Sequence, residues 1–221
     1  MVDSSVGVDI LPDVPIDGMR PLWSLVQTRG STGSDTPIAA STAGNLIVVG
    51  VETANVGQVV AVTDTANNVY VRVLGSRAIN EVQGLGIELW YAKNAKAGAT
   101  RITVDGATVR AVVAWEAAGL DPVNPLGSAS KLDDRPATTT PLGAAITTTT
   151  AGELVISIAI VGNAVSGLTA GSAFTNDQMT FGNGWAHLTN NQAPAGTYQA
   201  QWNQPNAGAY CATSASFRLA P

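Results

Sequence analysis

One histidine and one cysteine restrict the nucleophilic and metal chemistry open to this chain. His187 is the only histidine in the 221 residues, which excludes a two-histidine metal site and leaves any Ser-His-Asp triad to this residue. Its segment, Trp185-Ala-His-Leu-Thr, alternates as a strand does, so we expect a structural or surface role. Cys211 lies in the apolar segment Ala209-Tyr-Cys-Ala-Thr, which indicates a buried free thiol.

Three glutamates are the carboxylates that a glycosidase could use. Glu88 and Glu116, with Glu52 as a third, lie on or beside apolar runs, whereas glycoside hydrolysis requires two carboxylates that face one cleft. Nothing in the spacing of the three sets a distance between them, and a carboxylate at the end of an apolar run usually points to solvent. We therefore predict no catalytic residue.

Two acidic segments could supply oxygen ligands for calcium. Asp64-Thr-Ala-Asn-Asn and Asp133-Asp134 are both expected in loops, but neither follows a complete calcium-loop pattern. We interpret their carboxylates as acceptors that stabilise turns. No metal ion and no cofactor is predicted for this chain.

Aromatic side chains would serve a sugar-binding role, because a sugar ring can stack on an exposed indole or phenol ring. Trp185 follows Gly182-Asn-Gly, which is typical of a loop tip, and Trp202 and Tyr198 share one face of an alternating segment. The alternative is that these rings fill the core, as large aromatic residues do in most folds. If the chain binds a glycan, we predict stacking on Trp185, Trp202 and Tyr198.

The segments that must position these residues have the pattern of β-strands. Continuous apolar runs rich in β-branched residues predict central strands near residues 45–53, 109–115 and 153–161. Residues 69–73 and 197–203 alternate instead, which predicts half-exposed strands. Turn formers separate the runs and no helical period is sustained, so we predict an all-β, antiparallel β-sandwich of jelly-roll type.

An internal echo divides the chain into two halves. Ser41-Thr-Ala-Gly-Asn-Leu-Ile-Val-Val matches Thr149-Thr-Ala-Gly-Glu-Leu-Val-Ile-Ser at an offset of 108 residues, and a fainter match relates Gly98 to Gly196. We predict half-repeats over about residues 41–117 and 149–219 that pack face to face as one sandwich, because neither closes a core well alone. The joining stretch, residues 121–148, is expected to be a long loop or an edge strand.

Residues 1–36 differ from the rest, because prolines and acidic residues interrupt every pattern. We predict an extended N-terminal arm, in which Trp23-Ser-Leu-Val-Gln-Thr can form a first strand, ahead of a sandwich domain over residues 37–221. The first residues lack the basic and then apolar pattern of a signal peptide, and the apolar runs are too short to span a bilayer. We expect neither a signal peptide nor membrane insertion.

Charge limits the partners. Charged residues are 12% of the chain, against about 25% in typical soluble domains, and the formal net charge is −5. Nucleic acid is an unsuitable partner, because phosphate binding needs clustered Lys and Arg. A surface so poor in charge suits a subunit that is buried in an assembly or displayed outside the cell.

Several strings in order, over about residues 40–220, resemble a β-sandwich module of bacteriophage virion proteins and bacterial surface proteins. The strings are Gly44-Asn-Leu-Ile-Val-Val, Val62-Thr-Asp-Thr-Ala-Asn-Asn-Val-Tyr, Glu88-Leu-Trp-Tyr-Ala, Lys96-Ala-Gly, Gly119-Leu-Asp-Pro-Val-Asn-Pro-Leu and Ala151-Gly-Glu-Leu-Val. The resemblance implies display, adhesion or virion decoration, and it brings no catalytic residues.

Together these observations favour a non-enzymatic structural protein. Our first hypothesis is a virion component, either head-decoration or tail-associated, that forms homo-oligomers, contacts other virion or surface proteins and is anchored by its N-terminal arm. The alternative is a carbohydrate-binding or adhesion module on a cell surface or a phage tail. The expected location is the virion, or the extracellular side of a cell under the alternative.

Overall fold

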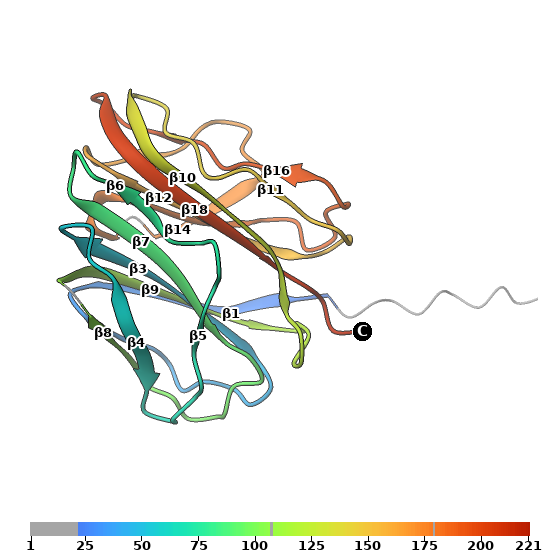
Figure 1. The fold of residues 1–221 in the computed structure, drawn as a ribbon. Helices are drawn as coiled ribbons and strands as arrows, with labels where there is room; N and C mark the ends of the chain where they lie inside the picture. Colours follow the sequence, from blue (N-terminus) through green and yellow to red (C-terminus); the bar gives the residue numbers. More distant parts are fainter. Residues whose placement is uncertain (1–21, 107, 179) are drawn as a thin grey trace, which may run out of the picture.

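The computed structural model describes residues 22–106, 108–178 and 180–221, which fold as an all-β structure of antiparallel sheets (Figure 1). The predicted sandwich class is confirmed, whereas the jelly-roll connectivity stays a prediction. Besides strands, this part of the chain holds a short 3-10 turn, η1, at Thr180–Gly182. None of its helices is long and apolar enough to cross a membrane.

The first half builds a six-stranded sheet and a smaller outer sheet. The six-stranded sheet has the order β1-β9-β3-β7-β5, with β6 also paired to β7, and the outer sheet has the order β2-β8-β4. The strands are β1 (Ser24–Thr32), β2 (Asp35–Pro37), β3 (Leu46–Ala54), β4 (Val59–Asp64), β5 (Val71–Arg72), β6 (Ala78–Asn80), β7 (Leu85–Ala92), β8 (Arg101–Gly106) and β9 (Val109–Ala118).

The second half repeats this plan. Its five-stranded sheet has the order β10-β18-β12-β15-β14, and its outer layer consists of the pairs β11-β16 and β13-β17. The strands are β10 (Leu126–Thr138), β11 (Ile146–Thr147), β12 (Leu154–Val161), β13 (Gly167–Leu168), β14 (Phe174–Gln178), β15 (Gly184–Leu188), β16 (Thr197–Tyr198), β17 (Trp202–Asn203) and β18 (Gly208–Phe217). In both halves the last strand lies between the first strand and the strand that follows the echoed turn.

The two large sheets pack against each other, with the first half below the second in Figure 1. Leu46 and Val48 of β3 point into a core shared with Ile156 and Ile158 of β12. The intervening residues of each strand point the other way, into separate cores under the outer layers. Burial on both faces explains the continuous apolar runs. In addition to the shared core, each half has a core cluster of its own under its outer layer.

Each echoed turn is held by a buried carboxylate, which comes from β9 in the first half and from the residue just before β12 in the second. In the first half the backbone N–H of Thr42 donates to Oε1 of Glu116 on β9 (2.7 Å). In the second half the equivalent N–H of Thr150 donates to Oε1 of Glu153 (2.9 Å), which precedes β12. Glu153 occupies the position of Asn45 in the first half. The same turn is therefore held by a glutamate in both halves, but the glutamate comes from a different position in each. Glu116 is thus buried and structural, not directed at solvent.

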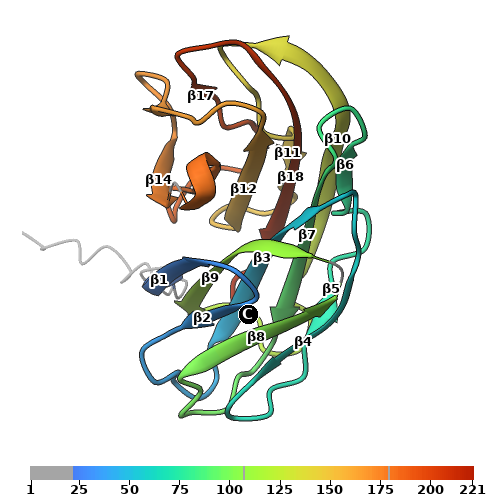
Figure 2. The same cartoon turned by 90° about the vertical axis from the view of Figure 1, so that its left-hand side faces the viewer.

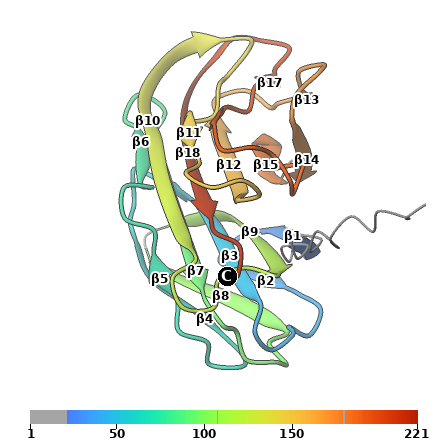
Figure 3. The ribbon, with the colours of Figure 1, turned by 90° about the vertical axis from the view of Figure 1, so that its right-hand side faces the viewer.

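The boundary predicted after residue 36 needs correction. Strands β1 and β2 begin within the predicted arm and pair with β9 and β8, and Trp23 is buried in the shared core. The sandwich therefore includes residues 22–36, while residues 1–21 of the predicted arm lie outside the described part. For the joining stretch, residues 121–148, we expected a long loop or an edge strand, and it contains an edge strand. This strand, β10, pairs with β18 and runs along the outside past β6 (Figure 3).

Candidate functional site

A groove of about 530 Å³ lies between β4 and β5. β4 ends the outer sheet of the first half and β5 ends its large sheet, so within the described residues each presents an unpaired edge to the groove. Figures 1 and 2 show the two strands at the same side of the molecule. The lining residues are Gln58, Val59, Val60, Val71, Arg72, Leu74 and Trp90.

The walls of this groove, which we call the edge groove, are apolar and exposed. Val60 is 71% exposed and Leu74 is 78% exposed, and Val71 beside them is also open to solvent. A bulge in the pairing of β4 with β8, between Val59 and Ala61, accompanies the outward position of Val60. Scattered exposed apolar residues need no explanation, but two valines and a leucine around one groove form a patch of the kind that marks a contact surface.

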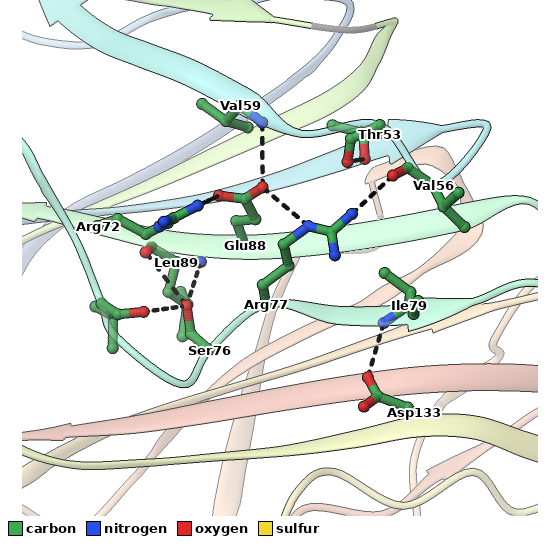
Figure 4. A network of polar contacts seen from close by, with 12 residues as sticks. Thr53, Val56, Val59, Arg72, Ser76, Arg77, Ile79, Glu88, Leu89 and Asp133 are labelled. Atoms are coloured by element: carbon green, nitrogen blue, oxygen red, sulfur yellow. Dashed lines mark hydrogen bonds and ion pairs between the residues drawn. The ribbon is translucent and has the colours of Figure 1, made fainter.

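A buried carboxylate, Glu88, holds Arg72, which lines the groove, and Arg77 beside it (Figure 4). Oε1 of Glu88 accepts the backbone N–H of Val59 (3.1 Å) and lies 3.5 Å from Nε of Arg77, and its Oε2 lies 3.7 Å from Nη1 of Arg72. Arg77 also donates to the carbonyl of Val56. The side chains of Arg72 and Arg77 are about one-third exposed while that of Glu88 is buried, so the carboxylate orients two cations that solvent can still reach.

The hollow next to the edge groove extends this cationic surface. It has a volume of about 340 Å³, and Arg72, Arg77 and Lys131 line it with no carboxylate among its lining residues. Lys131 also forms an ion pair with Asp133 (2.6 Å), which accepts the N–H of Ile79 (3.0 Å). Together the two hollows combine apolar walls with three cations.

A second, smaller pocket of about 210 Å³ lies where the two halves meet. Its floor is Glu52, which is 1% exposed, accepts a hydrogen bond from Nδ2 of Asn183 (2.7 Å) and lies 3.6 Å from Nη1 of Arg110. Burial raises the pKa of Glu52 to about 7, although Arg110 and Asn183 oppose the shift. The Arg110 guanidinium also lies 4.4 Å from the ring centroid of Phe181. We call this the junction pocket.

Phe181 is the exposed aromatic residue of the loop that the sequence pointed to. Its ring is 47% exposed, and its backbone has φ 57° and ψ 27°, a left-handed conformation that is unfavourable for a bulky residue. The predicted stacking residue of that loop, Trp185, is 0% exposed and donates its indole N–H to the carbonyl of Thr180. Of the two alternatives for Trp185, a stacking surface or a ring that fills the core, the structure has the second.

The other two predicted stacking residues do not form a platform with Trp185. Trp202 is 0% exposed and lies in the core of the second half, where its indole N–H contacts Asn176. Tyr198 is half-buried, and its hydroxyl donates to the carbonyl of Pro194. A sugar ring cannot stack on either indole, because both are enclosed by the packing of β12, β15 and the outer strands.

The three glutamates are not brought together as a catalytic pair. Glu88 and Glu116 flank β3 on opposite sides, opposite Val51 and Ile47 respectively. Val51 and Ile47 are four residues apart, which is about 13 Å along a strand. This separation already exceeds the roughly 5–9.5 Å between the two catalytic carboxylates of a glycosidase. Glu52 lies on β3 itself, and its side chain points to the other face of that sheet.

The remaining candidates have structural partners. His187 contacts Oδ1 of Asp177 through Nδ1 (2.7 Å), and the other oxygen of Asp177 accepts the indole N–H of Trp115 (2.8 Å). Cys211 is buried in the shared core, where desolvation raises the pKa of its thiol. No group of three or more His, Cys, Asp or Glu side chains placed to hold a metal ion occurs in the described residues.

The acidic segments that we interpreted as turn-stabilising accept hydrogen bonds from backbone and side-chain groups. Asp64 accepts the N–H groups of Ala66 and Asn68, and the hydroxyl of Tyr70, as a turn-stabilising residue should. Asp133 and Asp134 differ from the expectation of a local turn, because they accept N–H groups from the segment around β6, on the first half. They therefore link β10 to the first half.

Comparisons with models of protein families, with curated proteins and with solved structures found no match. The two pockets are therefore interpreted from their own geometry. No sequence motif indicated the apolar walls of the edge groove, or Arg110 and Phe181 of the junction pocket. A usable signal was present in Val69-Tyr-Val-Arg-Val, whose alternation predicted half-exposed valines beside an arginine.

Proposed function

We propose that this chain is a non-enzymatic structural protein that assembles through its sheet edges, as a head-decoration or tail-associated component of a bacteriophage virion. The edge groove carries this proposal. Natural sheets block their free edges with charges, prolines or covering loops. Here two edges that no described residue pairs with flank exposed Val60, Val71 and Leu74. The charge-poor composition and the resemblance to virion and surface modules support the same function.

The function is tested by the solution mass of the full chain, measured by light scattering behind a sizing column, with electron microscopy of the same sample. We expect a closed oligomer or an ordered array whose mass falls when Val60→Asp and Leu74→Asp are combined. Val82→Asp is the matched control, because Val82 is 84% exposed but does not line the groove. A chain that stays monomeric at every concentration would contradict the proposal.

A second candidate function, glycan binding, is favoured by the junction pocket. An exposed ring, Phe181, lies beside the planar polar groups of Glu52, Arg110 and Asn183, which is the combination of stacking and hydrogen bonding that a sugar requires. Binding to a panel of bacterial polysaccharides should fall with Phe181→Ala and persist with Val123→Ala, an exposed apolar residue outside the pocket. Equal loss in both variants would contradict this site.

A further inference from the structure

We propose that residues 6–11 of one copy bind in extended form along the edge groove of a second copy. The inference rests on the proposed function as an assembling subunit and names the contact through which it assembles. Three observations support it. Residues 6–11 alternate in hydrophobicity and are acidic, the groove lies between strand edges that no described residue pairs with, and the segment and the groove lie at opposite ends of the same sheet.

Residues 6–11 read Val-Gly-Val-Asp-Ile-Leu, followed by Pro12. In an extended chain Val6, Val8 and Ile10 face one side, and Asp9 faces the other. Proline cannot donate a backbone hydrogen bond, so Pro12 ends the part that can pair fully with a strand edge. Six extended residues span about 20 Å, which matches the six residues of β4.

The edge groove presents what such a segment needs. The edges of β4 and β5, which pair with no other strand in the described part of the chain, can offer backbone donors and acceptors, although the N–H of Val59 already donates to Glu88. An added strand takes its affinity from backbone hydrogen bonds and its specificity from alternate side chains that enter pockets. Val60, Val71 and Leu74 supply the apolar surface for Val8 and Ile10.

The charges of the two partners are opposite. Residues 1–21 contain four aspartates and one arginine, so they carry −3 of the net charge of −5. The lining of the edge groove and its neighbouring hollow holds Arg72, Arg77 and Lys131 and no carboxylate. Glu88 lies buried beneath two of these cations and Asp133 pairs with the third, which leaves the arginines the better partners for Asp9.

The position of the groove favours a second copy as its partner. The segment enters the fold just before β1, at one end of the sheet order β1-β9-β3-β7-β5, while the groove lies at β5, the other end. A segment that leaves one edge and binds the opposite edge of the next copy makes a head-to-tail contact. Such contacts close into a ring or continue as a chain, depending on the rotation between copies.

Two full-length variants with complementary defects test the proposal. The segment variant carries Val8→Asp and Ile10→Asp, and the groove variant carries Val60→Asp and Leu74→Asp. We expect each variant alone to associate at least about tenfold more weakly than the parent chain, the scale of losing one apolar anchor. Mixed together they should form a 1:1 complex, because one retains the groove, the other retains the segment, and the contact cannot propagate.

A disulfide trap identifies the contact directly. Copies with Val8→Cys are mixed with copies with Val60→Cys, and a covalent dimer of the two is expected, whereas the buried native Cys211 should not react. Val82→Cys replaces Val60→Cys as the control and should give no dimer.

The other outcomes separate this inference from the proposed function. If the segment variant assembles like the parent chain, the inference fails and assembly through another surface stands. If the double variant Val8→Cys and Val60→Cys closes within single chains, binding in trans is refuted. If the parent chain is monomeric and no trap forms, both the inference and the proposed function fail.

Discussion

Replacing Glu52 by glutamine should change how the stability of this protein depends on pH. Glutamine keeps the shape of the side chain and can still accept the hydrogen bond from Nδ2 of Asn183, but it cannot ionise. Arg110 loses an ion-pair partner, yet its side chain is one-third exposed and can be solvated. The comparison thus isolates the ionisation of one buried carboxyl group.

The size of the effect follows from the pKa of Glu52. Burial raises it from the ordinary value of 4.5 to about 7, so between these values the folded chain binds more protons than the unfolded chain. The free energy of unfolding must then fall as the pH rises through this window. One pKa unit corresponds to about 1.4 kcal/mol, which makes the full loss about 3 kcal/mol, a large part of a typical domain's 5–15 kcal/mol.

Urea titrations of the parent chain and the Glu52→Gln variant at pH 4, 5, 6, 7 and 8 measure this loss. We expect the stability of the parent to fall by about 3 kcal/mol relative to the variant between pH 4 and pH 8. The other titrating groups are common to both chains and cancel in the difference. Parallel curves, or a parent that gains stability over the variant as the pH rises, would refute the reasoning.

Three further expectations concern the packing and the buried polar groups. Glu88→Gln should destabilise the fold by about 2 kcal/mol, because Arg72 and Arg77 both lose a charged partner. Urea titration at neutral pH measures this loss. Gly50→Ala should cost about 1–3 kcal/mol in the same assay, because a Cβ there would lie 2.6 Å from a core methyl group. Gly196→Ala should stay within about 0.5 kcal/mol, because the nearest atoms to a Cβ there lie 3.9 Å away, at ordinary contact distance. Cys211 should react with a thiol reagent only after unfolding, because it is buried and its thiol pKa is raised; rapid labelling of the native chain would contradict its burial.

The edge groove and the junction pocket could be predicted from the sequence only in fragments. The glycine-rich turn before Trp185 indicated an exposed loop, and the structure does place an exposed aromatic residue there. That residue is Phe181, because Trp185 starts a strand whose alternate side chains enter the shared core. A one-residue difference in register exchanges the two faces of a strand, and local sequence does not determine which face meets the other half.

Periodicity and repetition, which are properties of the chain itself, determined the all-β class, the three central strands and the two matching halves. They did so because a strand buried on both faces must be apolar throughout, and because the echoed turns require left-handed glycines at Gly44 and Gly152. The tertiary structure alone decided which carboxylates are buried, which aromatic ring is exposed and which sheet edges stay open. These depend on how distant strands are ordered and layered, and that order is set by packing between segments about 100 residues apart.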